Sequence, residues 1–165
     1  MLIARFSKVA MVASLAAFAF IVTYDNLIDY GTNYEFVKHV LSMDTSLPGN
    51  KLTGRAITSP TLWKVFYGAI IAAEALTFVL LATGAIAMFL AMRSPASGFH
   101  RTKAWAVAGV TAGFLVWFFG FMVVGGEYFA MWQSKTWNGQ EAAFRFYITM
   151  LAVLIFVMQP DAELD

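Results

Sequence analysis

Apolar residues occur along this chain in long runs separated by polar segments, a pattern typical of helices that cross a membrane. A hydrocarbon layer of about 30 Å needs roughly 20 apolar residues in a helix. Four runs meet or approach that length, at residues 3–24, 62–92, 104–125 and 142–158. The sequence therefore predicts an all-α fold, a four-helix transmembrane bundle built as a single integral membrane domain over residues 1–165.

The first apolar run could instead belong to a signal peptide. Arg5 and Lys8 precede an apolar stretch that contains the small-residue pattern Ala17-Phe18-Ala19, as cleaved leaders do. We favour a retained helix, because the apolar run continues to Tyr24 and is long enough to span.

Basic residues near the span ends predict the orientation. Short stretches without acids hold Arg5, Lys8, Arg93, Arg101 and Lys103. Cytoplasmic loops carry an excess of Lys and Arg, so we expect both termini in the cytoplasm, with outer loops at residues 25–61 and 126–141. Lys64 and Arg145 lie near the outer span ends and weaken a simple count.

The first outer loop is predicted to contain a short amphipathic helix. Thr32-Asn33-Tyr34-Glu35 has the spacing of a capping box, which marks a helix start. The following residues place Phe36, Val37, Val40 and Leu41 on one apolar face. Leu47-Pro48-Gly49-Asn50 then supplies turn residues. We expect this helix to lie on the membrane surface or across the mouth of the bundle.

Composition excludes several classes of protein. With 60% hydrophobic and 13% charged residues, the chain is too apolar for an ordinary soluble domain. Its net charge of +1 and scattered basic residues give no footprint for nucleic acid. The absence of cysteine removes disulfides, thiolate metal sites and Cys nucleophiles. Membrane lipids are the partners that this composition implies.

Glu74 is the most informative single residue, because a charge within a membrane span is a functional hypothesis by default. Tyr67, Glu74 and Thr77 share a helical face, and Arg145 could approach Glu74 across the bundle. One interpretation is a structural ion pair, or a protonated glutamic acid that is hydrogen-bonded to a neighbour. The other is a proton or cation relay. The inner half of the bundle offers no ionisable chain to continue a relay, which argues against a pump.

Other chemistry has little support in the sequence. Asp25, Asp29, His39 and Glu127 lie in the outer segments and could attract a hard cation, but no calcium-loop spacing occurs and a solvated acidic rim is the simpler interpretation. His39 and His100 fall on opposite sides, so a bis-His haem is not expected. No hydrolase elbow, zinc-protease helix or phosphate loop is present. We therefore expect no catalytic residues, metal or cofactor, and a protein that is not an enzyme.

The third span has two contrasting faces. Small residues, which permit close helix contacts in lipid, form one stripe at Ala106, Gly109, Gly113 and Gly120. Gly68, Ala72 and Ala75 form a similar stripe on the second span, so these two spans are expected to touch or to support oligomerisation. Candidate partner-docking residues are the rings Phe114, Trp117, Phe118 and Phe121 of the third span, with Trp132 and Trp137 of the outer loop.

Outer aromatic residues allow two interpretations. Trp63, Tyr67, Tyr128, Phe129, Trp132, Trp137 and Tyr147 gather near one predicted boundary. An interfacial aromatic belt is the simpler explanation, and a stacked-ligand site is the alternative.

Two loop segments resemble those of a known family. The first is Asn33 to Thr45 followed by Pro48-Gly49-Asn50, and the second is Gly125 to Ser134 followed by Trp137-Asn138-Gly139-Gln140. They resemble a bacterial family of predicted small integral membrane proteins, domain of unknown function family 2165. The resemblance covers essentially the whole chain and implies four spans in a bacterial inner membrane, without an activity, ligand or catalytic residue.

These observations favour a function in recognition rather than reaction. The leading hypothesis is a non-catalytic accessory or scaffold subunit that docks on a larger bacterial inner-membrane complex, such as a respiratory or photosynthetic one, or that forms a homo-oligomer. The alternative is a small membrane carrier for an ion, quinone or lipid that uses Glu74 and Arg145.

Overall fold

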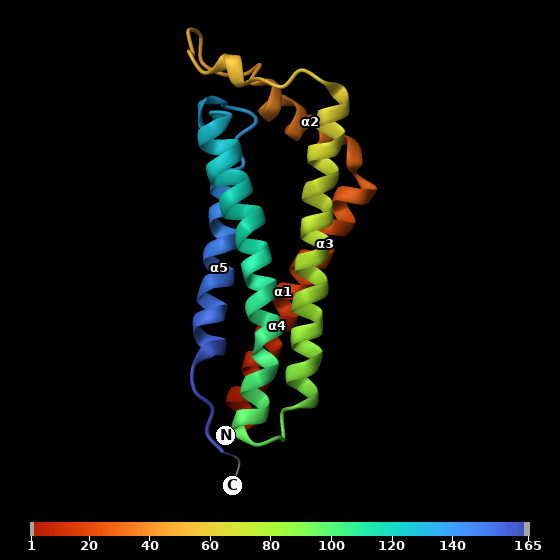
Figure 1. Ribbon diagram of the computed structural model, residues 1–165, viewed down its shortest axis with the longest axis vertical. Helices are drawn as coiled ribbons and strands as arrows, with labels where there is room; N and C mark the ends of the chain where they lie inside the picture. Colours follow the sequence, from red (N-terminus) through yellow and green to blue (C-terminus); the bar gives the residue numbers. More distant parts are fainter. Residues whose placement is uncertain (1, 164–165) are drawn as a thin grey trace.

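The computed structural model describes residues 2–163, which form a bundle of long helices with no strand in that range (Figure 1). The long helices are α1 (Leu2–Ile28), α3 (Pro60–Leu90), α4 (Ala96–Phe114) with its continuation η2 (Leu115–Tyr128), and α5 (Gln140–Met158). Within the described residues, four helical segments are long and apolar enough to cross a membrane. The predicted all-α, four-helix transmembrane bundle is confirmed.

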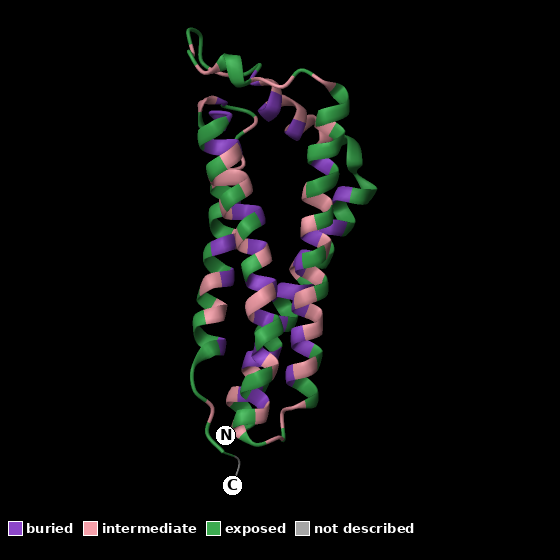
Figure 2. Cartoon of the chain, viewed as in Figure 1, coloured by how far each residue is buried: buried purple, intermediate pink, exposed green. Residues whose placement is uncertain are grey.

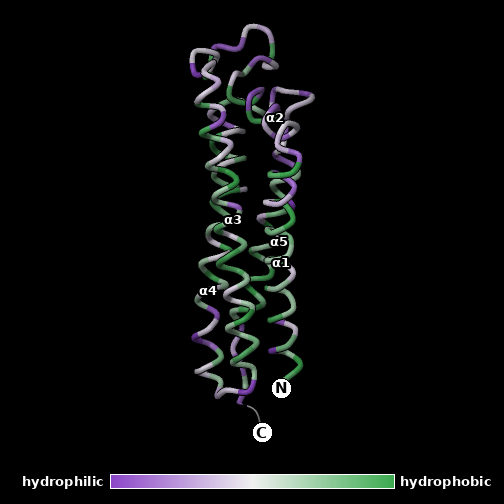
Figure 3. The backbone as a smooth tube through the Cα atoms, turned by 90° about the vertical axis from the view of Figure 1, so that its right-hand side faces the viewer, coloured by the Kyte–Doolittle hydropathy of each residue, from purple (hydrophilic) through white to green (hydrophobic). Residues whose placement is uncertain are grey.

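The two ends of the bundle differ. Both chain termini lie at one end, which we call the terminal end (Figure 1). The opposite, loop end holds the short helices α2 (Tyr30–Ser42), η1 (Thr53–Arg55) and η3 (Met131–Gln133). Hydrophilic residues concentrate near the two ends and hydrophobic residues between them (Figure 3), as a protein crossing lipid requires.

Some helices extend beyond the predicted span limits. The third span begins at Ala96 and ends at Tyr128, so the polar residues Arg101 and Lys103 are helical. The helix is longer than its apolar run, because hydropathy detects only the apolar part whereas the helical backbone hydrogen bonds continue through the polar residues at its start. The second span begins at Pro60, where Ser59 Oγ accepts a hydrogen bond from the backbone N–H of Leu62 and Pro occupies a first-turn position that needs no donor.

Helix α2 confirms the predicted amphipathic helix but not its start. It begins at Tyr30, before the expected capping box, and the Thr32 hydroxyl donates to Asp29 Oδ1 at 3.0 Å. The helix ends at Ser42, where Met43 adopts a left-handed conformation with φ 53°. Its buried residues Val37 and Val40 belong to a hydrophobic cluster at the loop end. The helix therefore covers the mouth of the bundle.

Small residues bring α3 and α4 together, as predicted, but only in the half nearer the terminal end. A side chain placed on Gly109 would meet Leu81 Cγ at 2.7 Å, and one on Gly84 would meet the backbone nitrogen of Ala106 at 2.9 Å. The expected stripe at Gly68 and Ala72 is exposed and is not this contact. Gly120 is also outside it, because a Cβ there would meet only a backbone oxygen of its own helix. Burial follows the inward helix faces (Figure 2).

Helix α4 changes at Leu115 into the π-helix η2, which continues to Tyr128. π-Helices are rare and often occur at functional sites. Helix α3 packs along α1 and α4 but makes few contacts with η2. The bundle is therefore tightly packed toward the terminal end and more open beneath α2.

Candidate functional site

A cavity of about 310 Å³ lies within the loop-end half of the bundle. All four spans and α2 contribute residues to its wall. Asp25 of α1 and Asn33 of α2 line it, and because Asp25 is exposed the cavity reaches the protein surface near these residues. Its volume is at the lower end of the range for small-molecule sites.

Glu74 lines this cavity from α3, with a relative exposure of only 2%. Its Oε2 accepts a hydrogen bond of 2.7 Å from the side-chain amide of Asn26 on α1. No donor from residues 2–163 contacts the other carboxylate oxygen, Oε1. The cavity therefore presents a carboxylate that its protein neighbours satisfy only in part.

Tyr67 of α3 hydrogen-bonds to Asn26, the residue that also contacts Glu74. Its hydroxyl lies 3.0 Å from the backbone oxygen of Asn26 and 3.2 Å from Asn26 Oδ1. Asn26 lies in the last turn of α1, where carbonyl groups lack partners within the helix. Tyr67 thus fixes the Asn26 amide so that the amide nitrogen points to Glu74. These three hydrogen-bonded side chains form the polar part of the cavity wall.

Aromatic rings form much of the remaining wall. They are Phe36 of α2, Tyr67 of α3, Trp117 and Phe121 of η2, and Phe146 of α5. The Trp117 and Phe146 rings meet edge to face at 5.9 Å, and Phe36 stacks on Phe121 at 6.0 Å. A carboxylate and aromatic faces therefore line the same cavity.

A second cavity of about 270 Å³ adjoins the first between α2, α3 and η2. Its wall is almost wholly apolar and includes Phe66, Phe119 and Phe129. Both cavities are lined by Phe36, Val37, Ile70 and Phe121, which therefore mark the boundary where the two cavities adjoin. The site thus combines a polar chamber with a neighbouring apolar one.

The structure brings only some predicted site residues together. Glu74, Tyr67 and Asp25 line the polar cavity. Thr77 does not, because its hydroxyl donates to the Ala73 carbonyl and its methyl group faces Gly113 of α4. Thr77 does lie on the same face of α3 as Glu74, as its spacing predicts, but it lies nearer the terminal end and does not reach the cavity.

The expected approach of Arg145 to Glu74 does not occur. Arg145 Nη2 donates to Glu141 Oε1 on its own helix, and the side chain is 70% exposed. A long Arg side chain near a helix end can keep its charged group at the interface, so it does not need to enter the bundle. Asn26, not Arg145, is the partner of Glu74.

The remaining acidic-rim candidates lie outside the cavity. Asp29 accepts from Thr32, and Glu127 is exposed. The His39 ring stacks on Trp137 at 4.6 Å, and its Nδ1 lies 2.7 Å from Asp44 Oδ2. Within residues 2–163 no group of three His, Asp or Glu side chains is arranged to hold a metal ion.

The aromatic face of the third span turns inward. Trp117 is buried against Phe18 and Phe146, while Phe114 and Phe118 pack on Tyr147. This leaves little of the predicted docking face for a foreign subunit.

Not every ring assigned to an aromatic belt lies at the surface. Tyr67, Phe129 and Tyr147 are buried, whereas Trp132 is 51% exposed. The belt interpretation is therefore wrong for the three buried rings.

Comparison with known families agrees with this architecture. A family model described as "Predicted small integral membrane protein (DUF2165)" matches residues 4–160. The chain belongs to this family. No curated protein and no solved structure matches it. The DUF2165 description and the four apolar helices together establish an integral membrane protein.

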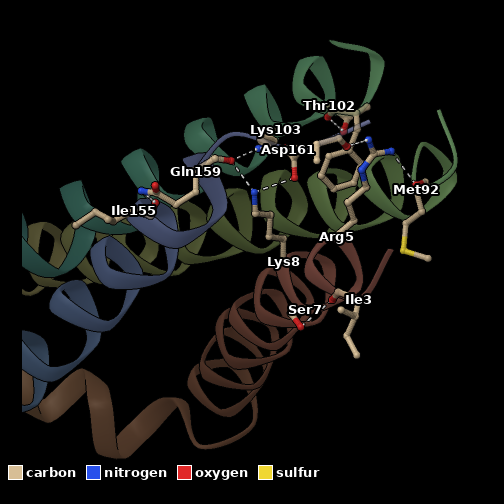
Figure 4. Close-up of polar contacts among 12 residues, drawn as sticks. Ile3, Arg5, Ser7, Lys8, Met92, Thr102, Lys103, Ile155, Gln159 and Asp161 are labelled. Atoms are coloured by element: carbon tan, nitrogen blue, oxygen red, sulfur yellow. Dashed lines mark hydrogen bonds and ion pairs between the residues drawn. The ribbon is translucent and has the colours of Figure 1, made fainter. Parts of the chain in front are cut away.

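A buried charged cluster at the terminal end of this DUF2165 chain is the main feature that the sequence analysis missed (Figure 4). Lys8 and Lys103 both form ion pairs with Asp161 and both donate to the Gln159 carbonyl. Arg5 donates to the carbonyls of Met92, Ser94 and Ala162. The sequence analysis placed Arg5, Lys8 and Lys103 near this end but did not predict that they meet in one buried cluster.

The cluster fastens the C-terminal segment of the DUF2165 chain to α1 and α4. Phe99 is fully buried beneath it, with the Arg5 guanidinium 5.0 Å and Lys103 Nζ 5.6 Å from the ring centre. Burial by itself raises the pKa of Asp161, but hydrogen bonds from Lys103 and Lys8 and the charges of both residues outweigh that effect and hold its pKa below the ordinary value. The spacing of Arg5 and Lys8 on one helix face could have indicated such a contact.

Proposed function

We propose that this protein is a non-catalytic membrane protein that binds a small amphiphilic molecule inside its loop-end cavity, as a carrier or receptor does. The observation that carries the proposal is the buried Glu74 carboxylate lining that cavity. Placing a charged side chain in a membrane span is costly, and only one of its oxygens has a donor from residues 2–163. A ligand that contacts this carboxylate explains why the side chain is there.

The adjoining apolar chamber supports an amphiphilic ligand. A polar group would lie near Glu74, Asn26 and Tyr67, while an apolar part would reach past Phe36 and Phe121 into the second cavity. This proposal keeps Glu74 from the carrier hypothesis, adds Tyr67 and omits Arg145, which is exposed and does not line the cavity.

Native mass spectrometry of protein purified in mild detergent tests this proposal. Ala142 is exposed and lines the cavity, so Ala142→Trp should fill the cavity from its mouth. We expect a co-purified small molecule on the wild type and its loss from this variant. Ala72→Trp is the matched control, because Ala72 is an exposed α3 residue that does not line the cavity. Equal occupancy in Ala142→Trp and the wild type would overturn the proposal.

A second candidate is an accessory or scaffold subunit that docks on a larger bacterial inner-membrane complex, respiratory or photosynthetic. The ordered loop end favours it. Thr45 Oγ1 donates to Ser134 Oγ at 2.9 Å, and the Leu47 N–H donates to Gln133 Oε1 at 3.1 Å, so the two loops form one surface. Trp132 is half-exposed there, and aromatic residues of this kind are enriched at interfaces.

In-cell cross-linking from a photoreactive residue at the exposed position 135 tests the docking role. Stoichiometric adducts with larger membrane subunits, lost in Trp132→Ala, are the expected result. Adducts only with a second copy would instead indicate a homo-oligomer, and adducts with neither would remove this candidate.

A further inference from the structure

We propose that the molecule bound in the loop-end cavity is an organic cation, an amine or quaternary ammonium with an apolar substituent. This inference rests on the proposed binding function and specifies the ligand class. Its basis is the combination of charge, aromatic faces and size in one cavity.

The charges around the cavity favour a cation. Glu74 and Asp25 both line it, and none of the described residues that line it is Lys, Arg or His. Asn26 gives Glu74 one hydrogen bond, so one carboxylate oxygen remains for a donor or a positive charge. An anionic ligand would meet repulsion here and no basic partner.

The aromatic rings favour the same ligand class. Phe36, Tyr67, Trp117, Phe121 and Phe146 come from four different helices and surround the space in which Glu74 lies. Each aromatic face carries negative potential, and several faces around one site are the arrangement that recognises ammonium groups. The interaction strengthens when water is excluded, as it is near Glu74 with its 2% exposure.

The donor set argues against a metal ion. Calcium takes six to eight oxygen ligands and magnesium a near-octahedral shell. Within the described residues no three His, Asp or Glu side chains could hold a metal together, and rings occupy much of the wall. A volume of about 310 Å³ fits a small organic cation, whose substituent can lie in the adjoining apolar cavity.

Equilibrium dialysis of protein in lipid nanodiscs tests the charge requirement directly. The probes are benzyltrimethylammonium and neopentylbenzene, which have nearly the same shape but differ in charge. We expect saturable binding of the cation and much weaker binding of the neutral isostere. Equal binding of both probes would overturn the inference, while leaving an amphiphile-binding cavity in place.

Variants locate the binding. Glu74→Gln and Trp117→Leu should each weaken the affinity for benzyltrimethylammonium by about tenfold or more, the loss expected for a desolvated cation contact. Glu127→Gln and Trp132→Leu remove exposed counterparts outside the cavity and should keep the wild-type affinity. Unchanged affinity in Glu74→Gln would overturn the inference.

Two further measurements keep the test decisive. If Glu74→Gln does not fold, Asp25→Asn and Phe146→Leu replace it, since both residues line the cavity. If neither probe binds, native mass spectrometry distinguishes the failures. A co-purified molecule that is lost in Ala142→Trp would overturn only the cation class, whereas no retained molecule would overturn the binding function as well.

Discussion

The side-chain amide of Asn26 donates a hydrogen bond of 2.7 Å to the Glu74 carboxylate, joining the end of α1 to the middle of α3. Tyr67 holds the same amide from its other side. By hydropathy, Asn26 is only a polar residue at the end of the first span. In the structure it is the hydrogen-bond partner of Glu74, the single acid within the second span. We expect the stability of the loop-end half to depend on this contact, and its binding chemistry is proposed to depend on the same carboxylate.

Asn26→Leu should destabilise the bundle by about 1–3 kcal/mol, the cost of leaving a buried polar group unsatisfied. The Glu74 carboxylate would lose the donor that contacts its Oε2. Unfolding in mixed micelles measures the change. The double variant Asn26→Leu with Glu74→Leu should recover part of the loss, because the orphaned carboxylate is gone. A single variant as stable as the wild type would show that the hydrogen bond contributes little.

Gly84→Ala should destabilise the protein by about 1–3 kcal/mol, the usual effect of adding volume to a packed interface. Its Cβ would lie 2.9 Å from the backbone nitrogen of Ala106, which cannot move aside cheaply. Gly68→Ala is the matched control on the same helix, since nothing lies within 4 Å of its Cβ. Thermal unfolding in detergent distinguishes them. Equal melting temperatures would contradict the close α3–α4 contact.

Asp161→Asn should destabilise the terminal end by about 1.5–3 kcal/mol near neutral pH, as expected when hydrogen bonds to a charged group are weakened. Lys8 and Lys103 would lose their shared carboxylate. Helicity and denaturant unfolding in detergent report the loss. Arg101→Ala should have little effect, because Arg101 is an exposed basic residue at the same end of α4; a loss as large in Arg101→Ala would point to net charge rather than this contact.

The same carboxylate predicts a pH dependence. Its pKa in the folded protein lies below the ordinary value of 3.8, so the unfolded chain takes up a proton more readily. The contribution of Asp161 is therefore present above pH 3.8 and is lost as the pH falls through the folded value. Wild-type stability should fall in that acidic window more steeply than that of Asp161→Asn. Parallel pH curves for the two proteins would be inconsistent with the ion pairs.

Arg145→Ala should change the free energy of unfolding by no more than about 0.5 kcal/mol, because exposed ion pairs one helical turn apart contribute little. Arg145 contacts Glu141 on the surface of α5 and does not reach Glu74. Chemical unfolding of the variant and of Glu141→Ala should give similar small values. A loss of several kcal/mol in Arg145→Ala alone would show that Arg145 has a buried partner.

Single cysteines can be labelled directly in this cysteine-free chain and test its orientation. Residues 51 and 135 lie at the loop end and are exposed, while residues 93 and 100 lie toward the terminal end. We expect impermeant reagents to label 51 and 135 from outside intact cells, and 93 and 100 only after permeabilisation, because Arg5, Lys8, Arg93, Arg101 and Lys103 lie in short acid-free stretches toward the terminal end. The opposite pattern would reverse the proposed orientation, and labelling of 51 and 135 from different sides would contradict the fold.

The sequence predicted the elements better than the contacts between them. Long apolar runs gave the four spans, and a period of 3.6 residues gave the buried face of α2. Which side chains meet between helices depends on the rotation of each helix about its own axis, and the residue pattern of a single helix does not determine that rotation. For that reason the sequence indicates Glu74 as a candidate site residue but suggests Arg145, in place of Asn26, as its possible partner.

Two further errors have identifiable causes. The rings from Trp117 onward were placed by α-helical spacing, whereas η2 is a π-helix with a wider turn. Arg5 and Lys8 resemble ordinary interfacial flanks in the sequence, because their partners Gln159, Asp161 and Ala162 lie at the other end of the chain.

The contacts of Arg5 and Lys8 with the last described residues impose an order on biosynthesis. Ribosomes make α1 first, and Arg5 can reach Met92 and Ser94 before the rest of its partners are made. Lys8, and the contact of Arg5 with Ala162, must wait for residues 159–162, which follow α5. Closure of the terminal end must then follow insertion of α5. Residues 159–162 are therefore part of the folded bundle, and changing their number should impair this closure even where all four spans insert.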